Sequence, residues 1–283
     1  MQQKNNQYDI LAILVLYKMN LNDSVSFHSL LVSLKKATLR ILFLVYDNSP
    51  FCEKEPSKIW ENADGIIYKS NPMNPGLAVA YNYGANVANE MNIEWLLLLD
   101  QDTDFEKTYF NELQGYIGKY PKIHLFAPIL RLPDNTIFSP TRYKHKRGYT
   151  IKHITPGINN LLKILPVNSG MVIRTKKYIE AGGCNINLKI DFIDFQFLEK
   201  FRRIDNKFCV LNTFGCQAFS NTSDNKQRQL IRFKIYLKDA RTIEKRTIID
   251  RVLYFYTVFR HTTSLTLRFR TFEFLKMFIF NYF

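Results

Sequence analysis

The first hundred residues of the chain contain four short, almost uninterrupted apolar runs. Runs of this length without polar alternation are typical of strands buried on both faces of a sheet. Helices are expected between them: one follows Asn22 or Asp23, which can cap it, and another opens at Pro75-Gly76. This alternation predicts a mostly parallel sheet flanked by helices. The runs are residues 9–16 (DILAILVL), 40–46 (RILFLVY), 65–68 (GIIY) and 93–99.

Beyond residue 102 the pattern becomes less regular. From about residue 226 the chain is basic and aromatic, so we expect a domain over residues 1–225 and a helical C-terminal extension over residues 226–283. Within the domain, the pattern predicts helices over residues 109–120 and 191–203, strands over 124–128, 167–174 and 208–211, and an exposed basic loop over 141–150.

The formal net charge of +14 is concentrated in this extension, which carries 13 Lys and Arg against four Asp and Glu. Such asymmetry predicts an anionic partner: nucleic acid, a phosphorylated substrate or an anionic membrane surface. Five apolar residues of the extension recur at helical spacing. Their common face would lie on the membrane, or instead cover the domain or form a homodimer interface. They are Leu265, Phe269, Phe272, Leu275 and Ile279.

Several features bear on the compartment. No stretch approaches the roughly 20 apolar residues that a membrane-spanning helix needs, and the first residues lack the apolar core of a signal peptide. The cysteines form no CxxC pair, which indicates reduced thiols. We therefore expect a cytoplasmic protein, peripheral on the inner face of the cell membrane. The cysteines are Cys52, Cys184, Cys209 and Cys216.

Acidic residues follow two of the predicted strands. The fourth apolar run ends in LLLLDQDT, which places Asp100 and Asp102 directly after a buried strand, and Asp47 follows the second run. Buried carboxylates need water, a partner or a metal, and their hard oxygens suit Mg²⁺ or Mn²⁺ beside a diphosphate. In doubly wound sheets ligands bind at this end of the strands. For residues 47–50 (DNSP), a simple turn is the alternative.

Two further stretches could carry chemistry. Residues 71–84 contain Asn74 and Gly76 before a helix in which Asn82 could face the same crevice. Asp191 and Asp194 lie three residues apart, so on a helix they would share a face, where one carboxylate could serve as a general base. The alternative is a solvated helix start. No GxGxxG or GxxxxGK[ST] motif supports a dinucleotide fold or a phosphate-cradling loop.

Together these stretches resemble the ordered motifs of family 2 glycosyltransferases. The likeness covers roughly residues 9–215 and is closest to the bacterial rhamnosyltransferase-like subgroup, which builds O-antigen and capsular polysaccharides. It implies the α/β nucleotide-sugar fold called GT-A, followed here by the basic, aromatic extension. The motifs are Asp47-Asn48-Ser49, Asn74-Pro75-Gly76, LLLLDQDT, Asn168-Ser169-Gly170 and IDFIDFQF.

The resemblance also implies roles for individual residues. Asp47 would bind the uracil or thymine base, Asp100 the ribose and metal, and Asp102 the metal at the donor diphosphate. Asp194, with Asp191 beside it, would deprotonate the acceptor hydroxyl for an inverting attack on the anomeric carbon. The remaining nucleotide-binding residues would be Asn48, Asn74, Gly76 and Asn82, and the acceptor-binding residues Ser169, Gly170 and Gln196.

The expected activity is therefore transfer of rhamnose or another hexose from a dTDP- or UDP-sugar to a lipid-linked glycan, with Mg²⁺ or Mn²⁺. The sequence departs from the family in two ways. Gln196 replaces an acid, and no histidine lies between His153 and His261, where the family often has one near residues 214–225. The alternatives are a nucleic-acid-binding protein, which no recognisable nucleic-acid motif supports, and an inactive partner subunit.

Overall fold

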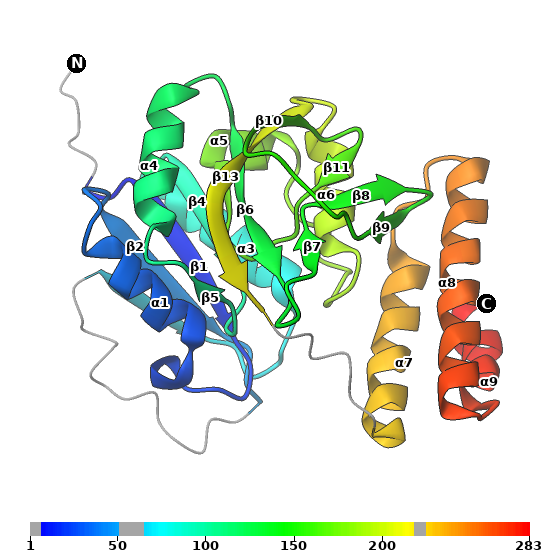
Figure 1. Cartoon of the computed structure of the whole chain (residues 1–283). Helices are drawn as coiled ribbons and strands as arrows, with labels where there is room; N and C mark the ends of the chain where they lie inside the picture. The colour runs from blue at the N-terminus through cyan, green and yellow to red at the C-terminus, as the bar shows by residue number, and fades with distance from the viewer. Residues whose placement is uncertain (1–6, 51–64, 218–224) are drawn as a thin grey trace.

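The computed structural model describes residues 7–50, 65–217 and 225–283. Four parallel strands form one half of its main sheet, in the order β4-β1-β2-β3, as the apolar runs predict (Figure 1). All residues of β1, β2 and β4 are buried. The strands are β1 (Ile10–Leu16), β2 (Ile41–Asp47), β3 (Ile66–Ser70) and β4 (Trp95–Leu99).

The other half of this sheet is mixed. β12 (Met171–Arg174) runs antiparallel to both β4 and β6 (Leu125–Arg131), and β13 (Lys207–Cys216) is parallel to β6. Three short strands complete it: β5 (Asp104–Phe105), β7 (Ile137–Ser139) and β10 (Gly157–Asn160). The carboxyl ends of β2 and β4 therefore bring Asp47 and Asp100 to the same edge, as predicted.

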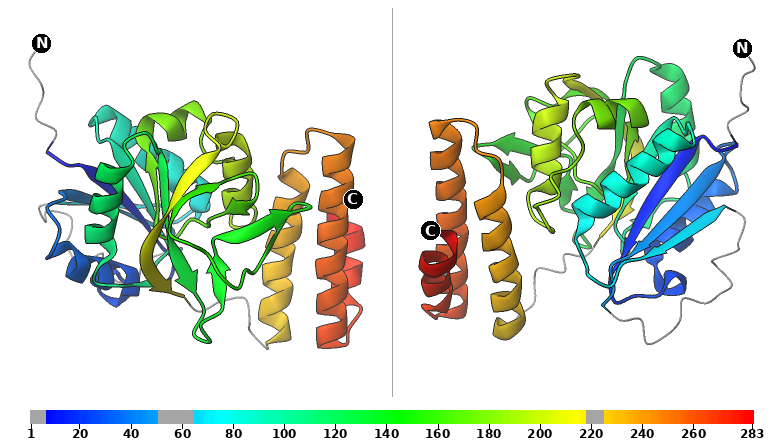
Figure 2. Two further views of the ribbon diagram at one scale, coloured as in Figure 1. Left: turned by 45° about the horizontal axis from the view of Figure 1, so that its top comes forward. Right: turned by 180° about the vertical axis from the view of Figure 1, so that it is seen from behind.

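Helices cover both faces of the sheet (Figure 2). Alternate residues of β1 point into two different cores: Leu11 and Ile13 into one, Ile10 and Ala12 into the other. The first core is closed by α3 (Leu77–Glu90), α5 (Thr175–Glu180) and α6 (Ile193–Phe201), and the second by α1 (Val25–Leu34) and α4 (Tyr109–Lys119).

The predicted cap of α1 is wrong by one or two residues. A short 3-10 helix, η1 (Leu21–Asp23), occupies the expected capping positions. The hydroxyl of Ser24 accepts the hydrogen bond from the backbone N–H of Phe27 at 3.3 Å instead. Serine satisfies a free helical N–H as well as asparagine or aspartate does, so the choice depends on where the preceding turn ends.

The expected basic loop over residues 141–150 is a β-hairpin. β8 (Thr141–Lys144) pairs with β9 (Arg147–Tyr149) and with β11 (Ile164–Leu165) in a separate small sheet. His145 and Lys146 form its tight turn with φ of 52° and 60°, the two left-handed positions that suit a two-residue hairpin. Within β8 buried and exposed residues alternate, and this was the overlooked strand signal.

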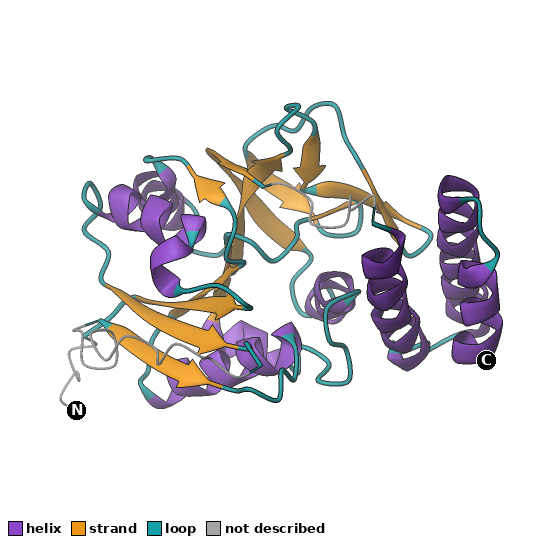
Figure 3. Cartoon of the chain, turned by 90° about the horizontal axis from the view of Figure 1, so that it is seen from below, coloured by secondary structure: helices purple, strands orange, loops and turns teal. Residues whose placement is uncertain are grey.

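The C-terminal extension forms three helices beside the hairpin (Figure 1): α7 (Lys226–Thr242), α8 (Ile248–Phe269) and α9 (Glu273–Tyr282). They share a small core of their own around Phe233 and Phe274. Figure 3 shows them to one side of the strands. None of the helices in the described ranges has the length and apolar character that crossing a bilayer requires.

The expected single apolar face from Leu265 to Ile279 is wrong. The chain turns at Arg270, which has a left-handed backbone (φ 48°) and ends α8. Leu265 is consequently buried, whereas Phe272 and Ile279 are more than half exposed. Helical spacing in a sequence does not show that the helix is continuous.

Candidate active site

Two carboxylates meet just beyond β4. Oδ2 of Asp100 and Oδ1 of Asp102 both accept hydrogen bonds from Nε2 of Gln217, at 3.2 and 2.9 Å. Gln217 follows β13, so the carboxyl ends of two strands supply the cluster. The side-chain NH₂ group of Gln217, which carries a partial positive charge, thus lies where oxygens of both acids converge.

This arrangement fits a divalent metal. Within the described residues no three His, Cys, Asp or Glu side chains come together as a metal site. Mg²⁺ is usually held by only one or two carboxylates, with water and substrate phosphates completing its coordination. Asp100 and Asp102 would be the protein ligands, and the amide oxygen of Gln217 could become a third if the side chain rotated.

The electrostatics of Asp100 point the same way. Burial raises the pKa of Asp100 to about 6, and the neighbouring Asp102 contributes to the rise, while hydrogen bonds from Gln217 and Tyr81 oppose it. The paired carboxylates are therefore costly to ionise together. A bound cation would remove most of that cost.

The second acidic element is Asp194, in the first turn of α6. It lines a cleft of about 500 Å³ together with Asp100 and Gln217. Burial raises the pKa of Asp194 to about 7, Asp100 contributes to the rise, and the backbone N–H of Asn168 counteracts it. A carboxylate with a pKa near neutrality can accept a proton from a substrate at physiological pH.

Asp191 does not share a helical face with Asp194, contrary to the prediction. Phe192 lies between them in a left-handed conformation (φ 63°), and α6 begins only at Ile193. Both oxygens of Asp191 are held by the guanidinium of Arg232 on α7, with one of the two contacts, Nη2 to Oδ1, at 2.7 Å. Asp191 is therefore committed to an ion pair, which leaves Asp194 as the base candidate.

Asp47 ends β2 and is almost completely buried. Its Oδ1 accepts the backbone N–H of Ser49 at 2.8 Å, which is the local turn that the sequence allowed, and its Oδ2 accepts the hydroxyl of Tyr68. An ionised carboxylate has about four acceptor positions, so the turn leaves capacity for another donor. The neighbouring Asn48 is buried, and its Oδ1 has no hydrogen-bond partner within the described chain.

The backbone conformation and the close packing at Gly76 both require a glycine. Its φ is 104°, and a Cβ at this position would lie 2.5 Å from the carbonyl oxygen of Lys189. The N–H of Leu77 donates to that same oxygen at 3.0 Å. Asn74 also has a positive φ, of 47°. The turn before α3 thus holds the segment that leads to Asp194.

The side chain of Asn82 is fully engaged by the protein, contrary to the expectation that it faces the crevice. Its Oδ1 accepts the hydroxyl of Tyr178 at 2.7 Å and the N–H of Cys184 at 2.9 Å, and its Nδ2 donates to the carbonyl of Cys184. We therefore assign it to the packing between α3 and the segment after α5.

The predicted acceptor residues also lie elsewhere. Ser169 is completely buried, and its hydroxyl contacts that of Thr103 at 2.7 Å beneath the acidic loop. Gly170 has a φ of 77°, and a Cβ there would lie 2.7 Å from Phe105 and Pro128. These two residues shape the core rather than the cleft wall. Gln196 is buried in α6, and its amide has no hydrogen-bond partner among the described residues.

The sequence analysis did not predict several polar residues that line the cleft, among them Arg147, Gln217 and Arg232. Gln217 lies in the stretch where the resembling family often has a histidine, and this was the available signal. Arg147 and Arg232 were visible only as members of basic segments, because nothing local shows which of many cations faces the cleft.

The sheet order, the flanking helices and the acidic strand ends define a GT-A fold. Solved structures share it. GalNAc-T7, determined with UDP, GalNAc and Mn²⁺, is similar with a TM-score of 0.57 and 12% identity; the match covers 98% of this chain but only 57% of that protein. Staphylococcus aureus TarS with UDP-GlcNAc gives a TM-score of 0.54 and 12% identity over 90% of this chain and 73% of TarS.

A third similar structure, TarS with UDP, has a TM-score of 0.51 and 13% identity over 90% of this chain and 72% of that one. No protein-family model matches the chain, and no curated protein matches it by sequence. At these identities the likeness is one of fold.

Proposed function

We propose that the protein is an inverting glycosyltransferase that uses a UDP- or dTDP-hexose. The observation that carries this is one cleft with two kinds of acid: Asp100, which with Asp102 and Gln217 forms the cluster suited to a metal and diphosphate, and Asp194, a single carboxylate suited to proton abstraction. The similar structures that contain UDP or UDP-GlcNAc support a nucleotide-sugar donor.

In this mechanism Asp194 accepts the proton of the acceptor hydroxyl. The hydroxyl oxygen then forms a bond to the anomeric carbon as the bond from that carbon to the diphosphate oxygen breaks, and the configuration inverts. A divalent metal held by Asp100 and Asp102 would neutralise the leaving diphosphate. Asp47 would accept a hydrogen bond from the base.

The proposed acceptor is a lipid-linked glycan of bacterial surface-polysaccharide synthesis, with rhamnose among the candidate sugars, and the proposed location is the cytoplasmic face of the membrane. Two features of the extension support this: its strong positive charge, and a set of exposed apolar side chains on α8 and α9. We call this set the apolar surface. Its members, each more than half exposed, are Ile248, Ile249, Val252 and Tyr256 of α8, Phe280 of α9, and Phe283, which follows α9.

A thermal-shift experiment tests the donor. UDP, dTDP and their hexose derivatives are added with Mn²⁺ or with EDTA, and single-stranded DNA is added as the competing ligand class. A nucleotide at a hundredfold excess over its Kd should stabilise the protein by about 2.7 kcal/mol. Metal-dependent stabilisation by a nucleotide, followed by detected sugar transfer, supports the proposal. Stabilisation by DNA alone would refute it.

A further inference from the structure

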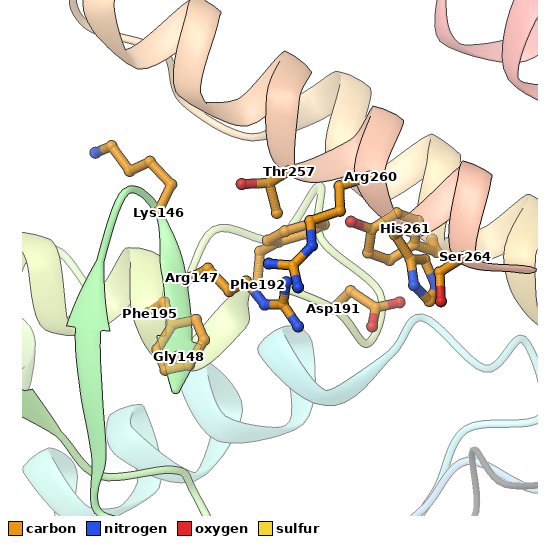
Figure 4. A pocket seen from close by; sticks show the side chains of 11 residues that line it. Lys146, Arg147, Gly148, Asp191, Phe192, Phe195, Thr257, Arg260, His261 and Ser264 are labelled. Carbon is orange, nitrogen blue, oxygen red and sulfur yellow. The ribbon is translucent and has the colours of Figure 1, made fainter. Parts of the chain in front are cut away.

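A second pocket, of about 310 Å³, adjoins the cleft (Figure 4). Its walls come from the β8–β9 hairpin, the segment before α6, and helices α7 and α8. Arg147, Asp191 and Phe195 line both spaces, whereas Arg260 and His261 line only the pocket. The segment around Asp194 therefore borders both the cleft and this pocket.

The described part of the chain leaves positive charge in this pocket without a matching carboxylate. Within the described residues, neither Arg147 nor Arg260 has a carboxylate within 4 Å, and Figure 4 shows both guanidinium groups reaching into the same space. The carboxylate of Asp191 is already matched by Arg232.

The other charged group, Lys146, is paired with Glu199 at 2.6 Å and Asp250 at 2.8 Å. The remaining titratable side chains are those of His261 and Tyr236. Burial lowers the pKa of His261, so its imidazole is mainly uncharged at neutral pH and offers one N–H. Among residues 7–50, 65–217 and 225–283, two guanidinium groups of the pocket therefore have no counterion.

Two like charges that converge in a partly enclosed pocket repel each other unless an anion lies between them. Guanidinium is planar and presents paired N–H donors, which match phosphate oxygens bidentately. The hydroxyls of Thr257 and Ser264 also line the pocket and can donate. The donor diphosphate does not need these groups, because its proposed site lies at Asp100 and Asp102, which do not line the pocket.

We propose that this pocket binds a phosphate or diphosphate group of the acceptor, through Arg147 and Arg260, and so presents the acceptor hydroxyl to Asp194. The inference rests on the proposed glycosyl transfer and adds a substrate class to it: an acceptor that carries an anionic phosphate next to the sugar. It also gives the C-terminal helices a part in the acceptor site, since Arg260 lies on α8.

Binding of inorganic diphosphate in EDTA tests the pocket separately from the donor site. Without metal, Asp100 and Asp102 repel an anion, so the proposed donor site should contribute little to the binding. Isothermal titration should show that Arg147→Gln and Arg260→Gln each weaken binding about tenfold or more, the size expected for losing a charged hydrogen-bond pair. Arg241→Gln, which removes an exposed charge of α7 outside the pocket, should change the affinity less than twofold.

Titration of each variant with UDP and Mn²⁺ serves as the control for folding and for the proposed function. Unchanged nucleotide affinity in Arg260→Gln shows that its cleft is intact. If the wild type binds UDP but not diphosphate, or if Arg241→Gln weakens diphosphate binding as much as Arg260→Gln does, the pocket assignment is wrong while glycosyl transfer still stands. Failure to bind any nucleotide, with diphosphate binding retained, would instead refute the proposed function.

Two ligands identify the source of the phosphate. Farnesyl diphosphate that binds much more tightly than glucose 1-phosphate would indicate a lipid-linked acceptor, and equal affinities would indicate a soluble phosphorylated glycan. In both cases Arg260→Lys, which keeps the charge but loses the planar donor pair, should restore only part of the affinity. A phosphate-free alkyl glycoside that binds as well as either, and is unaffected by both arginine variants, would overturn the proposal.

Discussion

At the level of single residues, ionisation of the buried Asp194 lowers the stability of the fold, yet the ionised form is the one that can act as the proposed general base. Its pKa of about 7 arises mainly from burial, so the folded protein disfavours the charged form that a general base needs. Asp194→Asn should lower sugar transfer by roughly 100- to 10,000-fold, because no base remains, while UDP affinity stays the same. Single-turnover rates and nucleotide titration measure the two effects separately.

The matched control is Asp191→Asn, which breaks the contact with Arg232 but leaves the base in place. It should retain much more activity than Asp194→Asn. The reverse ranking would show that the wrong carboxylate has been assigned.

The same residue predicts a pH dependence of stability. The pKa of Asp194 in the folded protein is raised above the ordinary value of about 3.9, so the folded state holds the proton more tightly than the unfolded state. The protonated carboxyl therefore contributes fully to the unfolding free energy below about pH 3.9, and this contribution is lost as the pH rises through 7. Asp194→Asn avoids this loss, so its gain in unfolding free energy should grow between pH 4 and 7 and level off above. Raising a pKa by one corresponds to roughly 1.4 kcal/mol of free energy, so the gain should amount to a few kcal/mol at most. Urea unfolding in EDTA at pH 4.5 and 8 measures it.

Asp102 carries the metal prediction. Asp102→Asn keeps the shape and the contact with Gln217 but removes a charge, so Mn²⁺-dependent binding of UDP should be abolished without loss of the fold. Asp104→Asn, an exposed acid two residues away, is the control and should bind normally. Full activity of Asp102→Asn at low Mn²⁺ would show that the metal is held elsewhere.

At the level of elements, α7 supports the loop before the base. Asp239 on α7 is completely buried and accepts the backbone N–H groups of Lys189, Ile190 and Asp191 at 2.8–3.0 Å. Asp239→Ala leaves all three donors unsatisfied and should cost roughly 3 kcal/mol of unfolding free energy, with slower transfer because the loop moves. Asp239→Asn retains one acceptor oxygen, so urea unfolding should place it between Asp239→Ala and the wild type.

The sequence predicted those elements whose signal is local. The apolar runs located β1 to β4, and the strand ends correctly brought Asp47 and Asp100 to one edge of the sheet. The sequence did not predict the features that depend on contacts between segments far apart in the chain. The N-terminal limit of α6 is fixed by the left-handed Phe192 and by contacts from α7, and the pairing of β8 with β9 requires two φ values that a basic stretch does not reveal.

The sequence did not predict some of the site residues for the same physical reason. Gln217 hydrogen-bonds Asp100 and Asp102 across more than a hundred residues of sequence. Arg260 reaches the pocket from α8, whose sequence does not show which of its side chains face the domain. Conversely, the position of Asn82 in the helix after Asn74 suggests that it faces the crevice, and Ser169 belongs to a stretch that resembles a family motif. In the structure their polar atoms form hydrogen bonds with other residues of the protein interior.

At the level of the whole molecule, some charged residues of the C-terminal extension hold it against the domain. Arg232 and Asp239 bind the extension to the loop before the base, and Lys146 in the hairpin turn pairs with Asp250 of α8. The extension is thus tied to the domain at several points around the cleft. Its other exposed cations and the apolar surface are the features that the proposed membrane contact would use.

The final prediction concerns that partner. We expect the full-length protein to sediment with vesicles that contain anionic lipid at low salt, since each Lys or Arg near such a surface contributes about 1 kcal/mol. The double variant Ile249→Glu/Val252→Glu changes only exposed positions and should keep UDP binding. It should release the protein from vesicles and reduce transfer to a lipid-linked acceptor far more than transfer to a soluble one. If the wild type does not sediment, and ultracentrifugation shows a dimer that the double variant dissociates, the apolar surface joins two copies of the chain instead.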